Sequence, residues 1–411
     1  MKMRVHLKKT TLIFVILTLT NVVMITDIGN GHVKTATTVY WPTNEWNATN
    51  PSDQSMNNST IYDLYDYIDT NNINIHSVSI VRNGFLIHEE YLIGAQLTSG
   101  INYGPGHPAD QVINETLHVQ WSATKTISAL LIGIAIDKGY INNVSQTFSS
   151  FFPSLTYNPS NKEIITIEHL LTMSSGIYGD SDPEMSAGAW NKTIQEILNP
   201  DLYFTPGTDF KYSSFSTTLL SAIINKTTNQ KTSEFAQNNL FDPIGISRED
   251  WYWEENSEGY NYGGFGLWFT PQAMSRIGLL MLNNGNWNGT QVISENWMLE
   301  MGTPRPVSSE YYGYLVWMSS WSYYAAGLGG QCIFLIPEHN LVVVFTAGVY
   351  PGNPTNDYIY IIENFIIGAI ISPPQDPGIP GYSLMVLLPL MIVGIAFFSK
   401  KMKNKSSLIV K

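Results

Sequence analysis

Strand-like alternation of apolar and polar residues marks both ends of the central part of this chain. Residues 76–82 and 85–92 flank Asn83-Gly84, a pair that favours the tight turn of an antiparallel hairpin. Similar stretches return much later in the chain, at residues 312–319, 323–327, 331–336 and 341–347. We expect these distant strands to meet in one antiparallel sheet.

Helical periodicity occupies most of the remaining chain. Residues 59–71 suit an amphipathic helix, residues 122–139 a long apolar helix, and residues 354–370 a closing helix. From residue 147 to about residue 300, the pattern indicates short helices and loops. The predicted fold class is therefore α+β: an antiparallel β-sheet flanked by helices, with an inserted, mostly helical lobe. We expect a ligand cleft between the sheet and the lobe.

Two longer apolar stretches lie outside this pattern. The first follows basic residues, which indicates a signal peptide or N-terminal anchor within residues 1–29. The second is uncharged from 378 to 398, long enough to cross a bilayer, and predicts a C-terminal transmembrane helix at 383–399. The lysines of the basic tail at 400–411 place this tail in the cytoplasm and the folded part outside the cell.

Between these stretches the chain divides into three parts. Residues 30–58 look like a polar, poorly packed lead-in, residues 59–371 form the folded domain, and residues 372–382 form a Pro/Gly-rich spacer. The single cysteine, Cys332, excludes an intrachain disulfide. The domain must therefore be stabilised by packing alone.

Acidic residues dominate the folded part. The formal net charge is −12, and nine of the 21 basic residues lie in the first nine or last twelve positions. The remaining 12 basic residues face 33 acidic ones, a balance that repels nucleic acid and excludes it as a partner. The sequence leaves the oligomeric state open.

The segment Ser122-Ala123-Thr124-Lys125 opens the long apolar helix. Serine and lysine three positions apart share one helix face, so the ammonium lies near the hydroxyl. A serine hydroxyl is a poor nucleophile until a neighbouring base accepts its proton. The pair is thus a candidate nucleophile and activator, although the same spacing also occurs on ordinary solvated helix surfaces.

Tyr212, in the turn at 206–214, is the candidate base. A nearby ammonium favours the phenolate, so Lys125 and Tyr212 make chemical sense as a pair. The literal Tyr-x-Asn at Tyr140 ends the helix that Ser122 opens, several turns away, and is rejected for that reason. A Gly-rich turn at 327–331 opens a strand, and its backbone N–H groups either serve as oxyanion donors or simply join two strands.

These segments together resemble the class C β-lactamase-related serine hydrolases, a family that includes esterases, D-aminopeptidases and 6-aminohexanoate-dimer hydrolases. The resemblance covers roughly residues 59–371 and is closest to the last of these groups. It rests on five segments in the same order, HVQWSATKTISALLIGIAIDKGYI, TIEHLLTMSSGI, PGTDFKYSS, GGFGLWFTPQAMSRIGLLMLNNGNWNG and AAGLGGQCIFLIPEHNLVVVFTAG.

The resemblance implies an acyl-enzyme mechanism that needs no metal and no organic cofactor. Ser122 attacks a carbonyl, and Tyr212, stabilised as phenolate by Lys125, accepts the serine proton and passes it to the leaving group. The backbone N–H groups of Ser122 and, by analogy, Gln331 hold the oxyanion. Residues of two loops are expected to line the substrate pocket, namely Tyr178, Asp180, Trp190, Leu328, Gly329 and Gly330.

The chain departs from the family pattern in two places. Ser214 stands where the family has the asparagine of Tyr-x-Asn, and Leu328-Gly329-Gly330 replaces a Lys-Thr-Gly. Since Leu328 cannot make a charge-assisted contact with a substrate carboxylate, efficient β-lactam hydrolysis is not expected.

The leading hypothesis is an extracytoplasmic, membrane-anchored serine hydrolase that cleaves small esters or short amides through an acyl-enzyme on Ser122. One alternative is a β-lactamase or D-amino-acid peptidase. A second alternative is a non-catalytic module that retains the fold and binds an acyl group or β-lactam.

Overall fold

The computed structural model describes residues 39–371 apart from position 44, residues 93–114, position 159, residues 180–189, positions 306 and 308–310, and positions 351 and 353. The predicted signal segment, spacer, transmembrane helix and tail lie outside the described residues. Among the helices within the described ranges, none combines the length and apolar character needed to cross a bilayer.

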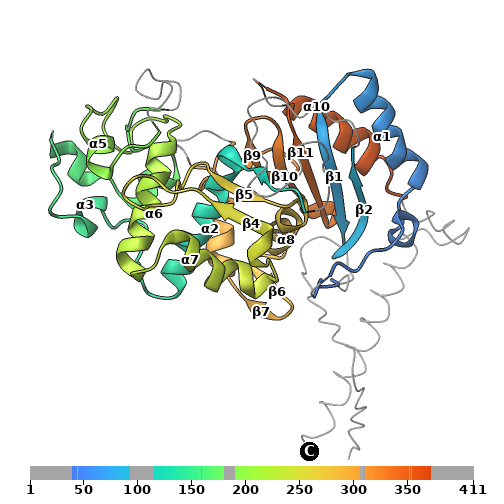
Figure 1. The fold of residues 1–411 in the computed structure, drawn as a ribbon, viewed down its shortest axis with the longest axis horizontal. Coiled ribbons are helices and arrows are strands. Elements are labelled where there is room, and N and C mark those ends of the chain that lie inside the picture. The colour runs from blue at the N-terminus through green and yellow to red at the C-terminus, as the bar shows by residue number, and fades with distance from the viewer. Residues whose placement is uncertain are drawn as a thin grey trace, which may run out of the picture.

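One six-stranded antiparallel sheet forms the half of the molecule seen at the right of Figure 1. Its strands follow the order β2-β1-β11-β10-β9-β8. Strands from the two ends of the domain pair directly, with Val78 opposite Phe345, which confirms the predicted sheet. The strand bounds are β1 (Ile75–Arg82), β2 (Phe85–Tyr91), β8 (Trp317–Met318), β9 (Tyr323–Gly327), β10 (Gln331–Ile336) and β11 (Leu341–Ala347).

Helices cover both faces of this sheet. On one face lie α1 (Asn58–Thr70) and α10 (Thr355–Ile361), the latter followed by a π-helical segment to Ile367 (Figure 1). Helix α8 (Pro271–Leu282) packs against β11 and β10 on the other face. A side chain at Gly278 would prevent this packing, because a Cβ there would lie 2.4 Å from Val342 Cγ1.

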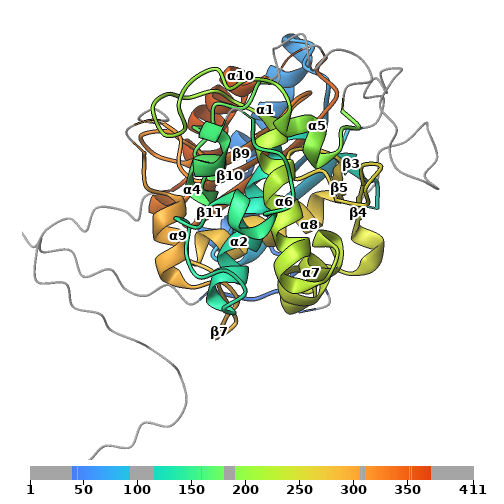
Figure 2. The same cartoon turned by 90° about the vertical axis from the view of Figure 1, so that its left-hand side faces the viewer.

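A mostly helical lobe is inserted between β2 and β8. Helices α2 (Thr124–Asp137) and α6 (Ser214–Thr228) pack on each other at its centre, as the end-on view in Figure 2 shows. The remaining elements of the inserted segment are α3 (Phe148–Phe151), α4 (Ile167–Leu171), α5 (Ile194–Leu198), α7 (Thr232–Ala236), α9 (Glu295–Met301), a small sheet of β3 (His118–Val119), β5 (Leu267–Phe269) and β4 (Trp251–Trp253), and the hairpin of β6 (Asn286–Trp287) and β7 (Thr290–Gln291). This arrangement confirms the α+β class.

Three local predictions are corrected. The long helix begins at Thr124, because residues 121–123 form a 3₁₀ turn instead. The predicted strand at 312–319 is a strand only at β8, because Leu315 takes a left-handed backbone conformation (φ 55°) that interrupts extended structure. The lead-in is packed where it is described, since Met56 is fully buried.

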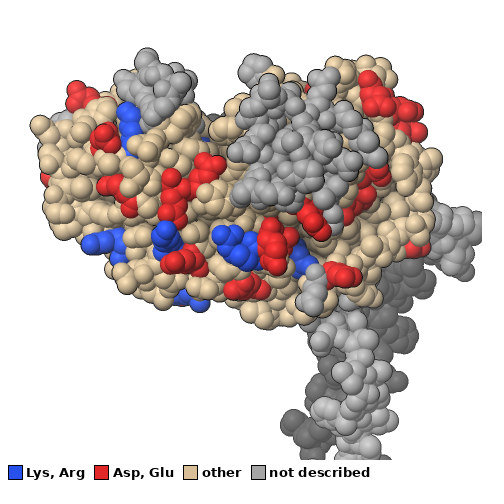
Figure 3. Space-filling model, in the orientation of Figure 1, with Lys and Arg blue, Asp and Glu red and all other residues tan. Residues whose placement is uncertain are grey.

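Charged side chains are scattered over the surface. On the face shown in Figure 3, single basic side chains alternate with acidic ones in the described part, rather than forming a continuous basic surface.

Candidate active site

Ser122 lies on a tight turn between β3 and α2. Trp121, just before it, has φ 44°, in the left-handed region that bulky residues rarely adopt. Two hydrogen bonds of Gln120 anchor the start of the turn. Its backbone N–H donates to Leu267 O (2.7 Å) and its side-chain Nε2 donates to His118 O (2.9 Å). The turn presents Ser122, half-buried, at the beginning of α2.

Lys125, in the first turn of α2, is only 1% exposed. Its Nζ donates to Ser122 Oγ (3.1 Å), Ser214 Oγ (2.8 Å) and the carbonyl oxygen of Gly264 (2.9 Å). The same nitrogen lies 4.6 Å from the centre of the Tyr212 ring. The structure therefore brings together the three predicted catalytic residues, which come from two distant parts of the chain.

The oxygens around Lys125 can pair all the donors of an ammonium. An ammonium has three N–H donors and no acceptor, whereas a neutral amine has two donors and one lone pair. Three oxygens surround Nζ, the carbonyl of Gly264 and two serine hydroxyls that can each act as acceptor, so an ammonium here has a partner for every N–H. A charge buried in this way is stable only when it is fully paired.

The contact with Gly264 depends on two adjacent glycines. A Cβ at Gly263 would lie 2.0 Å from Thr217 O, and a Cβ at Gly264 would lie 2.5 Å from Thr217 Oγ1. Only glycine, which has no Cβ, lets this segment approach α6 so closely that the Gly264 carbonyl reaches Lys125. This role of Gly264 was not predicted from the sequence, although the Gly-Gly pair that opens the segment GGFGLWFTPQAMSRIGLLMLNNGNWNG could have indicated a close backbone approach.

Ser214, the departure from the family's Tyr-x-Asn pattern, also has a defined place. It is the first residue of α6 and is buried, and its hydroxyl accepts a hydrogen bond from Lys125. Ser213, the N-cap of this helix, bonds the backbone N–H of Ser216 and so fixes where the helix begins. The substitution by serine therefore retains an oxygen acceptor for the lysine.

Tyr212 immediately precedes the α6 cap, and aromatic neighbours hold its ring. Trp317 on β8 stacks on it with ring centres 6.0 Å apart and an angle of 23°, and Tyr312 contacts it edge-on at 6.3 Å. These two residues were not identified from the sequence, because the pairing of a lobe residue with an edge strand is a purely tertiary contact.

Ser122 and Tyr212 line a cleft of about 370 Å³, and Lys125 contacts both from its buried position in α2. Among the described residues that line it there is no Asp, Glu, Lys or Arg. The lining residues are Ser122, Tyr212, Trp317, Tyr324, Ala326, Gly327, Leu328 and Thr355, so the cleft lies between the lobe and the sheet edge.

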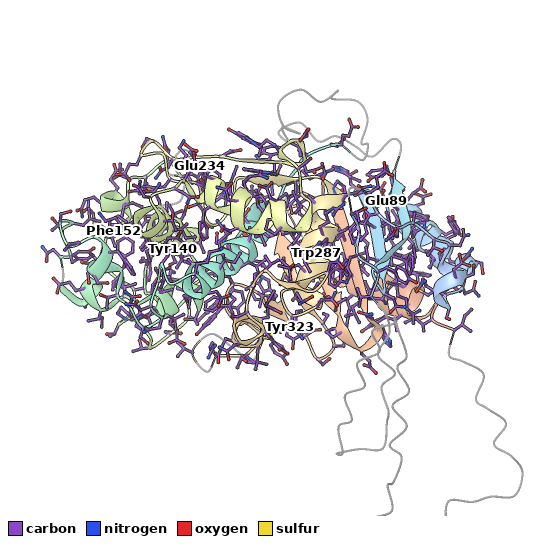
Figure 4. The ribbon with its side chains drawn as sticks, turned by 90° about the horizontal axis from the view of Figure 1, so that it is seen from below. Glu89, Tyr140, Phe152, Glu234, Trp287 and Tyr323 are labelled. Atoms are coloured by element: carbon purple, nitrogen blue, oxygen red, sulfur yellow. The ribbon has the colours of Figure 1, made fainter. Side chains whose placement is uncertain are left out.

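A larger cavity, about 560 Å³, is formed by α8, α9 and the opposite face of β9. Tyr323, labelled in Figure 4, lines this cavity, whereas its neighbour Tyr324 lines the smaller cleft. Because the larger cavity contains no member of the Ser122 cluster, the smaller cleft is the candidate active site.

Two of the predicted pocket residues lie elsewhere. Tyr178 is fully buried in the core against Phe215, and Trp190 packs edge-on against Phe265 rather than lining the cleft. Loop aromatics of this kind look alike in sequence whether they face a ligand or the core. Asp180 lies outside the described residues.

The Gly-rich turn lines the cleft with only some of its residues. Gln331 is buried in β10, where its side-chain amide donates to Ala347 O (2.7 Å) and accepts from Ala347 N (3.2 Å). Gly327, its register partner on β9, lines the cleft instead, together with the exposed Leu328. Gly329 and Gly330 are in the same turn but are not among the lining residues; they lie against Tyr350 and Tyr358.

Comparisons with known proteins agree with this architecture. The family model described as Beta-lactamase matches residues 69–362. Protein flp of Staphylococcus aureus (strain NCTC 8325 / PS 47) is 27% identical over 217 residues, which cover 48% of this chain and 41% of that protein. The chain thus spans about two fifths of the length of the first curated relatives that it matches.

Two solved structures show the same fold. A putative 6-aminohexanoate-dimer hydrolase from Bacillus anthracis superposes with a TM-score of 0.60 at 19% identity, covering 80% of this chain and 87% of that one. A family VIII carboxylesterase superposes with a TM-score of 0.59 at 14% identity, covering 75% and 96%. Since the family model spans most of the domain that holds the Ser122 cluster, this chain belongs to the beta-lactamase family.

Proposed function

We propose that this protein is a serine hydrolase that cleaves uncharged esters or short amides through an acyl-enzyme on Ser122. The observation that carries the proposal is the arrangement around Lys125, whose ammonium contacts Ser122 Oγ and lies beside Tyr212 in a cleft open to substrate. In the proposed mechanism Lys125 is an ammonium, which has no lone pair and therefore does not accept the serine proton. Tyr212 is then the general base.

The reaction proceeds in two half-reactions. As Ser122 Oγ attacks the substrate carbonyl carbon, its proton moves to the phenolate oxygen of Tyr212. Collapse of the tetrahedral intermediate breaks the bond to the leaving group, which takes that proton. In the second half-reaction, Tyr212 removes a proton from water, the resulting hydroxide attacks the acyl carbon, and Ser122 is released with its proton restored.

The oxyanion of the tetrahedral intermediate needs two donors. One is assigned to the backbone N–H of Ser122, as predicted. The second belongs to the sheet side of the cleft and stays assigned, as predicted, to the backbone N–H of Gln331 at the start of β10.

The lining of the cleft supports uncharged substrates. Its strand side consists of Trp317, Tyr324 and Leu328, which offer apolar and aromatic surface but no cation for a carboxylate. A β-lactam carries such a carboxylate and is therefore the less suitable substrate. The proposal that the enzyme acts outside the cell, tethered by residues 383–399, depends on the sequence pattern alone.

The test uses the full chain with two chromogenic substrates, a short-acyl nitrophenyl ester and a cephalosporin, and with a fluorophosphonate label. We expect turnover of the ester, little turnover of the cephalosporin, and labelling that Ser122→Ala abolishes. Ser150→Ala, at an exposed serine of α3, is the matched control and should behave as the wild type.

Other results of these assays would support one of the alternative functions or contradict the role of Ser122. Efficient cephalosporin turnover would indicate a β-lactamase. Labelling of Ser122 without turnover of any ester, amide or D-amino-acid peptide would indicate a binding module. Undiminished labelling of Ser122→Ala would remove Ser122 from the mechanism.

A further inference from the structure

Trp121 is held in its unusual conformation by a contact outside its own turn. Its indole N–H donates to the hydroxyl of Tyr350 at 2.7 Å. Tyr350 follows β11, 229 residues further along the chain. The bond therefore joins the residue before the nucleophile to a segment on the sheet side of the cleft.

Tyr350 is in turn packed against the Gly-rich turn. A Cβ at Gly329 would lie 2.4 Å from the Tyr350 ring, so the ring rests directly on the backbone there. Two backbone bonds tie the same segments, from Gly329 N to Gly352 O (2.9 Å) and from Val349 N to Gly329 O (3.0 Å). The turn after β9 and the segment after β11 are thus one rigid unit.

This unit carries the strand side of the active site. Gly327 and Leu328, which precede Gly329, line the cleft opposite Ser122. The end of β9 also touches the nucleophile turn, since a Cβ at Gly327 would lie 2.0 Å from Gln120 O and 3.3 Å from Trp121 Cβ. That second contact is close packing of Gly327 against Gln120 O and Trp121 Cβ.

We propose that the Trp121–Tyr350 hydrogen bond is a positioning device that sets the separation between Ser122 and the β9 rim. This inference rests on the proposed function, because the separation matters only if the two sides together bind an oxyanion. A hydrogen bond restricts direction as well as distance. It therefore constrains the orientation of the two sides as well as their separation, and it compensates for the strained backbone of Trp121.

The two residues are positioning residues and take no part in proton transfer. Burial raises the pKa of the Tyr350 hydroxyl above its ordinary value, so it stays protonated across the neutral range while it accepts from the indole. Removal of the bond should consequently change the rate without changing the pH dependence of the reaction.

The test compares Tyr350→Phe, Trp121→Phe and the double variant by kcat and KM for a short-acyl nitrophenyl ester. Tyr350→Phe keeps the ring on Gly329 and removes only the acceptor. We expect kcat to fall about tenfold, within the loss that sub-ångström misplacement of reacting groups produces. KM should change by less than about twofold, the pH profile should keep its shape, and the double variant should lose no more than either single variant.

Tyr140→Phe is the matched control, because this exposed tyrosine lies in the helical lobe (Figure 4). Within the described part of the chain, its one ring contact is edge-on with Phe235. Unchanged kcat in both single variants, or losses that add in the double variant, would overturn the positioning role. If one single variant does not fold, the other still tests the bond.

The two proposals fail in distinguishable ways. A wild-type chain that neither turns over ester nor reacts with fluorophosphonate ends the proposed function, and the positioning role with it. An active, labelled wild type with fully active Tyr350→Phe and Trp121→Phe ends only the positioning role.

Discussion

The two walls of the candidate active site use charge in opposite ways. The helical wall, from α2 and α6, buries the ammonium of Lys125 and supplies three oxygen acceptors for it. The strand wall, from β8 and β9, presents aromatic rings and backbone, with no charged side chain among its described lining residues. In the proposed function, reaction chemistry and substrate preference are therefore carried by different secondary-structure elements.

The difference has an energetic basis. A buried ammonium is destabilised by the loss of an acceptor, because the charge remains in a low-dielectric site. Leu328 on the strand wall is 44% exposed, so its replacement leaves no cavity and strands no charge. We infer that the helical wall constrains which residues are compatible with activity far more strictly than the strand wall does.

The largest expected effect is at Tyr212, the proposed base between the walls. Tyr212→Phe keeps the ring that stacks on Trp317 and removes the ionisable hydroxyl, so kcat for a nitrophenyl ester should fall by about 10²- to 10⁴-fold. Circular dichroism should show an unchanged fold. A near-normal kcat would mean that Lys125 alone acts as the base.

The next effect concerns the carbonyl of Gly264. In Gly264→Ala, the new methyl group would lie 2.5 Å from Thr217 Oγ1 and 2.9 Å from Ser214 Cβ, so the segment must move and its carbonyl must leave Lys125. We expect about a 10²-fold slower reaction with fluorophosphonate. The free energy of unfolding should also fall by about 1–3 kcal/mol, as for other overpacked sites. Labelling at the wild-type rate would show that the lysine does not need this acceptor.

A smaller effect is expected at Ser214. Ser214→Ala leaves one N–H of Lys125 without its acceptor, and a loss of about 1.5 kcal/mol, at the low end for a hydrogen bond to a charged group, corresponds to about a tenfold lower kcat. Ser216→Ala is the matched control, since this buried serine of the same helix bonds Ser175 instead. Equal losses in the two variants would indicate general destabilisation of α6 and argue against a specific effect on Lys125.

The smallest effect tests the strand wall. Leu328→Lys places a cation at the exposed rim of the cleft and should raise kcat/KM for a substrate with a carboxylate, relative to its uncharged ester, by about two- to fivefold at low salt. The gain should shrink in high salt, because exposed charges are screened. Leu328→Met, which adds no charge, controls for altered packing. An equal gain in both variants would contradict the electrostatic explanation.

Local patterns were sufficient to predict much of the fold. The hairpin at Asn83-Gly84 and the strands at 323–327, 331–336 and 341–347 follow from residues that are neighbours in sequence, because turn geometry and side-chain alternation are short-range properties. The placement of Ser122 beside Lys125 is of the same kind, since three positions along one helical turn bring the two side chains together. Their catalytic roles stay predictions.

Contacts between distant segments could not be predicted in this way. Gly264 is 139 residues from Lys125, and no local pattern indicates that its carbonyl reaches the ammonium. Strand register decided that Gly327 and not Gln331 lines the cleft, because residues of adjacent strands meet by pairing and not by their order along the chain. Tyr178 shows the same limit, since its burial depends on the arrival of Phe215 from α6.

The sequence by itself determined the chemical groups and the local elements that carry them: a serine and lysine on one turn, a tyrosine before a helix, and a glycine turn before a strand. Only the tertiary structure decided which oxygens surround the ammonium, which strand residue meets the nucleophile and which aromatic rings form the pocket. The physical reason is that hydrogen bonding and burial depend on separation in space, which the packing of the lobe against the sheet sets for residues far apart in the chain.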